Sequence, residues 1–214
     1  MTAAADDPSV ILFDLGNVLF CDPWESLLLT PDAGLVDRWG LDAAMVREAA
    51  RRLWDEFSVR ESEEPEYWQA LSRELGRTIS PELVAELERT LLVANPVADR
   101  LLAAACAGGT RPVGIASNNT SFWYAKQAER LDLARWIDPE LVFLSCRSGV
   151  TKGSPGRGLL EVAAEHTPPR STLVVEDRAA NLARARALGF RTYAYAFMGS
   201  AGVSSTELLE TMSG

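Results

Sequence analysis

The fold of this chain is decided by one stretch, Ser9-Val-Ile-Leu-Phe-Asp-Leu-Gly-Asn-Val-Leu-Phe20. Residues 10–13 form an unbroken run of apolar, mostly β-forming residues, which is typical of a strand buried on both faces of a parallel sheet. The run ends at Asp14, at the end of the strand where open α/β sheets bind their ligands. Gly16 and Asn17 then favour a sharp turn that exposes backbone groups beside the acid. An acid in this position can also be a simple turn cap, so the later segments have to decide between the two interpretations.

The composition indicates an ordinary soluble globular protein, with 47% hydrophobic and 24% charged residues in 214. The net charge of -9 argues against nucleic acid or an anionic membrane as a partner, and an anionic substrate would need a local positive site. The first eight residues lack the features of a signal peptide, and no apolar run is long enough to span a bilayer. The three cysteines are scattered, which favours reduced thiols, so we expect a cytoplasmic protein. The oligomeric state stays open.

Two residue types are scarce. His166 is the single histidine, which argues against a Ser-His-Asp triad or a zinc site built on imidazoles. Lys126 and Lys152 are the two lysines, so the other 19 of the 21 basic residues are arginines. A lysine retained in such a chain is a candidate for a site that needs a compact point charge.

A helical region follows the first stretch. Between Trp24 and Leu92 there is no continuous apolar strand run, and amphipathic helices are predicted at 42–57, 66–75 and 81–92. The acidic cluster at 61–66 is interpreted as a solvated loop. We therefore predict two units, listed by residue range: an α/β core, 8–22 and 95–214, and a helical cap, 23–94.

The rest of the chain alternates between strands and helices. The pattern predicts the strands 112–116, 141–145, 172–175 and 192–196, and the helices 97–107, 122–131, 159–165 and 179–188. At most one short helix is expected beyond residue 199. Such alternation implies right-handed crossovers and an α/β fold with a doubly wound, parallel five-stranded sheet.

Polar residues follow several of these strands. Ser117-Asn118-Asn119 follows the second strand, Glu176-Asp177 follows the fourth, and Lys152 lies on the loop after the third. These groups should converge with Asp14, because the carboxyl ends of parallel strands meet at one edge. Carboxylates suit Mg²⁺, and a magnesium ion, a hydroxyl and an ammonium group around a carboxylate suit phosphoryl transfer. The residue order of a P-loop is absent.

Four segments, in order and spacing, resemble the motifs of the haloacid dehalogenase (HAD) superfamily. They are FDLGNVL, IASNN, the lysine of GVTKGSP, and VVEDRAANLARARALGF. The resemblance covers nearly the whole chain after residue 8 and includes a helical insertion that is similar to a type I cap. The DLGNV and SNN forms look most like the branch typified by α-D-glucose-1-phosphate phosphatase.

The resemblance implies roles for the site residues. It makes Asp14 the nucleophile that forms an aspartyl-phosphate, and places Mg²⁺ on Asp14, the Gly16 carbonyl and Asp177, with Glu176 as a nearby metal or water ligand. It assigns phosphate binding to Gly16, Asn17, Ser117, Asn118 and Lys152, with Ser117 and Lys152 also catalytic. The implied activity is that of a Mg²⁺-dependent phosphoric monoester hydrolase acting on a small phosphorylated metabolite, a sugar phosphate above all.

The sequence departs from the family pattern at Gly16, where most HAD phosphatases carry a second aspartate as general acid and base. Either the leaving group departs unprotonated, or another acid such as Asp22 substitutes, or turnover is poor. Lys152-Gly-Ser-Pro also replaces the usual Lys-Pro-Asp-Pro. Dehalogenases of the superfamily lack the second aspartate too, but they have no use for Mg²⁺, so the Glu176-Asp177 pair favours a phosphatase. A dehalogenase and a weakly catalytic binding or regulatory protein remain the alternatives.

Overall fold

The computed structural model describes residues 7–106, 111–198 and 205–213. Residue 107, the last residue of the helix predicted at 97–107, lies outside the described residues. No helix among those described is long and apolar enough to cross a membrane.

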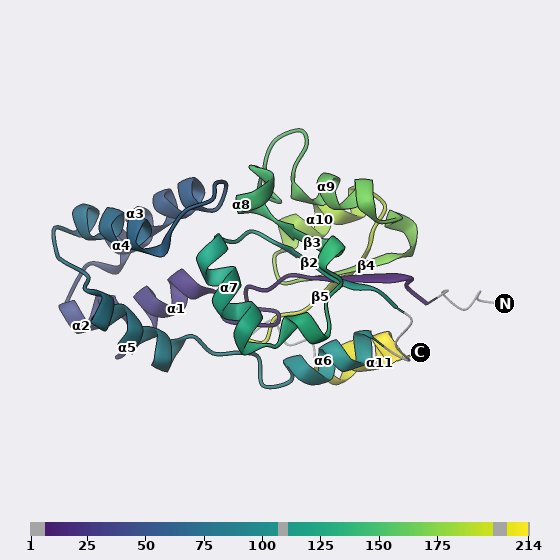
Figure 1. Ribbon diagram of the computed structural model, residues 1–214, viewed down its shortest axis with the longest axis horizontal. Coiled ribbons are helices and arrows are strands. Elements are labelled where there is room, and N and C mark those ends of the chain that lie inside the picture. The colour runs from purple at the N-terminus through teal and green to yellow at the C-terminus, as the bar shows by residue number, and fades with distance from the viewer. Residues whose placement is uncertain (1–6, 107–110, 199–204, 214) are drawn as a thin grey trace.

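A five-stranded, all-parallel sheet forms the centre of the core (Figure 1). Its strand order is β3-β2-β1-β4-β5. The strands are β1 (Val10–Phe13), β2 (Val113–Ser117), β3 (Val142–Leu144), β4 (Thr172–Glu176) and β5 (Arg191–Ala194). The first strand is thus the central one, and all its residues are buried, as an unbroken apolar run requires. The predicted fold class is confirmed.

Helices cover both faces of the sheet, because alternate residues of each strand point to opposite sides. Ile11 and Phe13 belong to the same apolar cluster as α6 (Ala98–Ala105) and α11 (Ser205–Ser213). Val10 and Leu12 belong to a second cluster. That cluster includes residues of α9 (Leu159–His166) and α10 (Ala179–Ala187), which lie across the sheet from α6 and α11 in Figure 1.

The first five of the described helices between β1 and β2 form a separate group beyond the carboxyl ends of the strands (Figure 1, left). They are α1 (Pro23–Leu29), α2 (Leu35–Trp39), α3 (Ala43–Phe57), α4 (Glu64–Leu75) and α5 (Pro81–Leu91). We call this group the cap. The sequence pattern predicted α3, α4 and α5 to within two residues at each end, but it did not predict α1 or α2, which are too short to show a clear period.

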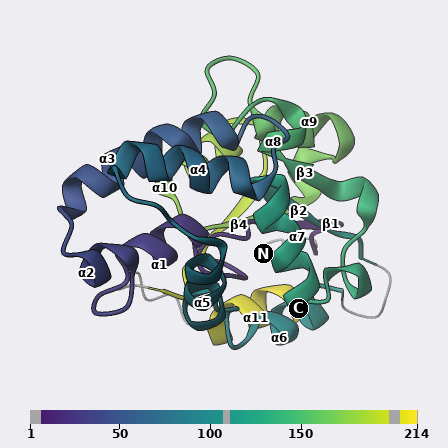
Figure 2. The same cartoon turned by 60° about the vertical axis from the view of Figure 1, so that its left-hand side comes forward.

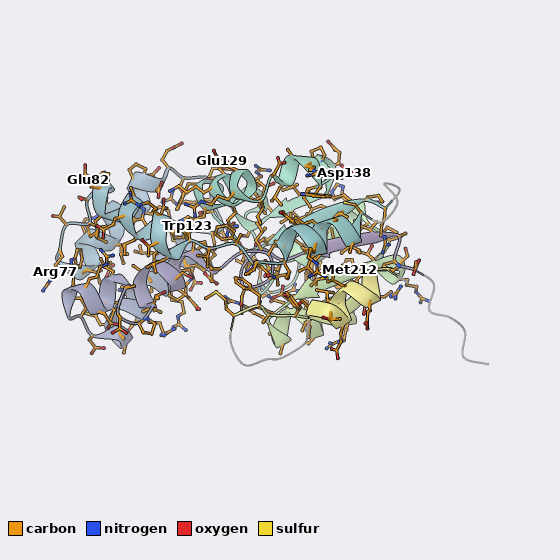
Figure 3. The ribbon with its side chains drawn as sticks, turned by 90° about the horizontal axis from the view of Figure 1, so that it is seen from below. Arg77, Glu82, Trp123, Glu129, Asp138 and Met212 are labelled. Carbon is orange, nitrogen blue, oxygen red and sulfur yellow. The ribbon has the colours of Figure 1, made fainter. Side chains whose placement is uncertain are left out.

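The helix α7 (Ser121–Arg130) lies where the core meets the cap, as the turned view in Figure 2 shows. Its Trp123 is fully buried and appears in the middle of the molecule in Figure 3. The ring stacks on Trp54 at 5.7 Å and meets Tyr67 edge-on at 5.0 Å, with both distances measured between ring centroids. Aromatic side chains therefore join the two parts of the chain in one continuous apolar core.

The acidic cluster at 61–66 is only in part the solvated loop that we expected: Glu61, Glu63 and Glu66 are exposed, but a helix begins at Glu64. Glu63 is the N-cap of α4, and Glu64 lies inside that helix. The ammonium group of Lys126 on α7 lies 2.7 Å from Glu64 and 2.6 Å from Glu88 of α5. Lys126 therefore links the core to the cap, and the hypothesis that it serves a site with a compact point charge is not needed to explain it.

Candidate active site

Asp14 follows β1 directly and is 8% exposed. Both its carboxylate oxygens have partners: Oδ1 accepts the Leu15 N–H at 2.7 Å, and Oδ2 lies 2.9 Å from Lys152 Nζ. Burial raises the pKa of this carboxyl and Glu176 raises it further, whereas Lys152 opposes the rise. The two contacts hold the carboxylate in one orientation at the edge of the sheet.

Lys152 is buried beneath the site, with its side chain 1% exposed. Its Nζ lies 2.9 Å from Asp14 and 2.5 Å from Glu176, and its backbone N–H donates to Asn118 Oδ1 at 2.8 Å. Burial alone would lower the pKa of Lys152, but the two carboxylates outweigh it and raise that pKa. The lysine is therefore kept charged in a place that water does not reach.

Glu176 ends β4 and is fully buried. Its Oε2 accepts from Lys152, and its Oε1 accepts from the Arg178 N–H at 3.0 Å and from Asn181 at 3.1 Å. Both oxygens are thus engaged, and this carboxylate fixes the position of Lys152. The role of metal or water ligand stays a prediction for Glu176.

Asp14, Glu176 and Asp177 bring three carboxylates together. One oxygen of each lies within 4.8 Å of one oxygen of the other two. Asp177 Oδ2 accepts from the Asn17 side chain at 3.2 Å, while its Oδ1 is buried without a hydrogen-bond partner among the described residues. A buried carboxylate oxygen without a partner is costly unless a cation completes it. The donor set therefore fits a hard divalent cation such as Mg²⁺.

The turn after Asp14 serves this cluster. Asn17 has a φ of 54°, in the left-handed region that asparagine tolerates better than most residues. Besides contacting Asp177, Asn17 accepts the Met198 N–H on its side-chain oxygen at 2.9 Å. Gly16 does not have a positive φ, so the turn itself does not require a glycine there. The glycine instead leaves a space beside the nucleophile candidate.

The loop after β2 lies on the other side of Asp14. The Ser117 hydroxyl is close enough to lower the pKa of Asp14, yet it is buried and forms no full hydrogen bond with a described residue. Asn118 accepts the backbone N–H of Lys152, and the Asn119 side chain donates to Gln127 at 2.7 Å. Ser117 thus keeps a free hydroxyl, while Asn118 and Asn119 shape the loop that presents it.

Asp22 contributes a further carboxyl. From the sequence it was only one candidate to replace the general acid that is missing at Gly16. Its Oδ2 accepts from Arg178 Nη2 at 3.0 Å, and its Oδ1 is buried with no hydrogen-bond partner in the described chain. The same Oδ2 lies 3.6 Å from the place where a Cβ on Gly16 would stand. Burial raises the pKa of Asp22 to about 7, even though Arg178 acts to lower it.

Two cavities lie between the core and the cap, each lined by residues of both. One of about 350 Å³ is lined by Asp22, Arg178 and Asp177 together with cap residues of α1 and α3. The other, of about 430 Å³, is lined by Arg178 and Asn118 on the core side and by Arg47 and Arg51 of α3 on the cap side. No pattern in the sequence singled out these three arginines, because Arg178 lies outside the predicted strand and the other two resemble ordinary surface residues of an amphipathic helix.

Comparison with known proteins places the fold. Neither the protein-family models nor the curated protein sequences gave a match to this chain. A magnesium complex of a HAD family enzyme from Bacteroides thetaiotaomicron is similar in structure, with a TM-score of 0.69, 17% identity, and 96% of this chain and 98% of that chain covered. A predicted HAD-like family hydrolase from Porphyromonas gingivalis has a TM-score of 0.62 and 21% identity, with 90% of this chain and 92% of that chain covered. An L-2-haloacid dehalogenase from Xanthobacter autotrophicus has a TM-score of 0.58 and 15% identity, with 96% of this chain and 88% of that chain covered. The chain therefore has the fold of HAD-like hydrolases.

Proposed function

We propose that this chain is a Mg²⁺-dependent phosphatase of the HAD superfamily that hydrolyses a small phosphorylated metabolite through an aspartyl-phosphate on Asp14. A sugar phosphate is the substrate that the motif resemblance favours, and the glucose-1-phosphate phosphatase branch is the finer assignment. The observation that carries the proposal is the cluster of Asp14, Glu176 and Asp177 against the ammonium group of Lys152. A solved complex of the Bacteroides thetaiotaomicron enzyme with magnesium and inorganic phosphate supports it by analogy of fold.

The same fold also occurs in the L-2-haloacid dehalogenase, so the fold alone does not choose the reaction. Displacing a halide from carbon requires a carboxylate nucleophile but no divalent cation. The unpartnered Asp177 oxygen beside Asp14 has no purpose in that reaction, whereas a phosphatase would use it to hold Mg²⁺. The carboxylate cluster thus favours phosphoryl transfer.

Each residue of the site then has a chemical task. Asp14, the Gly16 carbonyl and Asp177 would hold Mg²⁺, which when bound offsets the negative charge of the phosphoryl oxygens. Lys152 supplies a buried positive charge, and the free Ser117 hydroxyl and the loop shaped by Asn118 supply hydrogen bonds to the same oxygens. Glu176 keeps Lys152 in place. Catalysis in such a site is positioning and charge stabilisation.

The reaction proceeds in two displacements. A carboxylate oxygen of Asp14 attacks phosphorus, the bond from phosphorus to the leaving oxygen breaks, and that oxygen takes a proton. Water then attacks the phosphorus of the acyl phosphate, which releases inorganic phosphate and restores Asp14. We propose that Asp22 gives the first proton and accepts one from the water, because it fills the space beside Gly16.

Hydrolysis of p-nitrophenyl phosphate tests this function. We expect activity with Mg²⁺, loss of activity in EDTA, and recovery when Mg²⁺ is added back. Asp14→Asn should abolish turnover but keep the fold, which thermal unfolding monitors. Hydrolysis by purified Asp14→Asn would exclude the nucleophile assignment. Halide release from 2-chloropropionate that is indifferent to EDTA would establish the dehalogenase instead. Binding of phosphate esters without turnover would favour a regulatory protein.

A further inference from the structure

Two arginines of the cap face the cavity that adjoins the active site. Arg47 and Arg51 are one helical turn apart on α3, so they lie on the same side of that helix. Both line the cavity of about 430 Å³, whose core side includes Asn118 and Thr151, the residue before Lys152. The two guanidinium groups therefore border the space next to the proposed phosphoryl site, on the side where the rest of a substrate would lie.

These guanidinium groups have no acidic partner in the described parts of the chain. Two other arginines of the cap do have one: Arg38 pairs with Glu86 at 2.7 Å and Arg52 with Glu74 at 2.7 Å. Neither Arg47 nor Arg51 forms an ion pair or a hydrogen bond with a described residue. In a chain with a net charge of -9, acidic partners are plentiful. Two unpaired cations on one cavity wall are thus a local positive site of the kind that an anionic group requires.

Two carboxylates line the same cavity, so their negative charge has to be weighed against the positive charge of the two arginines. Glu25 belongs to α1 and Asp55 to α3, and both are exposed. Neither reaches ion-pair distance of Arg47 or Arg51 in the described structure, so they do not neutralise the two arginines by contact. The wall also includes Trp24 and Trp54, whose side chains are buried or half-buried, and the core residues Gly153, Arg178, Ala180 and Asn181. The cavity thus combines a cationic face with an apolar surface.

We propose that the substrate carries a second anionic group, a carboxylate or a second phosphoryl group, on its leaving-group side, and that Arg47 and Arg51 bind that group. The inference rests on the proposed phosphatase function, since it takes Asp14 as the phosphoryl end of the cavity. Arginine forms paired hydrogen bonds with carboxylate and phosphate, and such charge-assisted bonds are stronger than neutral ones. The two arginines therefore select for substrates with an anion at both ends.

Matched pairs of esters test the proposal. Phosphoglycolate and ethyl phosphate differ by a carboxylate, and glucose 1,6-bisphosphate and glucose 1-phosphate differ by a phosphoryl group. We expect kcat/KM to be roughly tenfold or more higher for the doubly anionic member of at least one pair. The pair that shows the preference identifies the second anion. The preference should fall toward unity in Arg47→Gln and Arg51→Gln, and it should persist in Arg52→Gln, whose guanidinium pairs with Glu74 outside the cavity.

Wild-type kcat/KM values equal within each pair would overturn the inference while leaving the phosphatase function intact. A preference that survives the Arg47→Gln/Arg51→Gln double variant would overturn it as well. If no ester is hydrolysed, the proposed function fails, and the inference is then decided by calorimetry on Asp14→Asn with Mg²⁺. Tighter binding of phosphoglycolate than of ethyl phosphate, lost when Arg47→Gln is added, supports the second-anion site, and equal binding refutes it.

Discussion

Asp22 lies beside Gly16, and its Oδ2 is 3.6 Å from the point where a Cβ on residue 16 would stand. In the motif that the sequence resembles, residue 16 would carry the general acid. Here the carboxyl of Asp22, the residue just before α1, reaches the same space. Arg178 holds it through the 3.0 Å ion pair, while burial keeps its pKa high enough for it to carry a proton near neutral pH. The chain thus has a carboxyl, that of Asp22, in the space that the missing side chain of residue 16 leaves open.

Asp22→Asn should reduce activity according to the basicity of the leaving group. For an alkyl phosphate such as glucose 6-phosphate we expect kcat/KM to fall by about 10²–10⁴, because the departing alkoxide needs a proton. For p-nitrophenyl phosphate the loss should be much smaller, because p-nitrophenolate departs without one. Asp99→Asn, which removes an exposed carboxylate on α6, should change neither rate. Equal losses of kcat/KM on both substrates would rule out Asp22 as the acid.

The acid should also be transferable to position 16. Gly16 has no positive φ, and among the described residues the Asp22 carboxyl is the one neighbour that a new Cβ would contact, at an ordinary van der Waals distance. In the double variant Gly16→Asp/Asp22→Asn we expect recovery of alkyl phosphate hydrolysis relative to Asp22→Asn alone. Gly16→Asp by itself should not improve on the wild type, because it would set two carboxyls side by side. Steady-state kinetics on glucose 6-phosphate measures both, and an inactive but folded double variant would contradict the account.

Stability without metal should depend on pH through Asp22. The folded pKa of about 7 is above the unfolded value of 3.8, so the folded state binds the proton more tightly. The resulting stabilisation is complete below the unfolded pKa and is lost as the pH rises toward 7. The free energy of unfolding in EDTA should therefore fall between about pH 4 and 7, by on the order of 2–4 kcal/mol from this group. Urea unfolding should show a smaller fall in Asp22→Asn, and identical pH profiles would contradict the assignment.

The sheet and the edge that carries the site could be predicted from the sequence for a physical reason. Strands buried on both faces appear as continuous apolar runs, and the polar residues that end them must meet at one edge. That is why Asp14, Ser117 and Glu176 could be predicted, without coordinates, to lie at one edge of the sheet. Lys152 was found for a different reason, because a lysine stands out among so many arginines.

The parts that could not be predicted depend on contacts between segments that are distant in sequence. Glu176 carries the same carboxylate as Asp177, and only the structure shows that its two oxygens are already engaged. Arg47 and Arg51 lie on the same helix as Arg52 and Glu56. The sequence pattern does not distinguish these charged residues, but in the structure Arg52 and Glu56 form ion pairs with Glu74 and Arg60. Arg47, Arg51 and Arg52 are all exposed, and which of them also line a cavity depends on how the cap is placed on the core.

The link between Lys126 and the cap makes a last prediction. Lys126 is 2.7 Å from Glu64 and 2.6 Å from Glu88, and the three side chains are between 11% and 28% exposed. Lys126→Met would leave two neighbouring glutamates without their cation, so we expect a loss of about 2–3 kcal/mol in the free energy of unfolding.

Burial already raises the pKa of Glu88, so acidification should neutralise this glutamate early and reduce the loss of stability in Lys126→Met. Arg52→Gln, which breaks an exposed pair, should cost less than about 1 kcal/mol. Urea unfolding at about pH 5 and pH 8 measures both variants, and equal costs for the two would show that Lys126 is an ordinary surface charge.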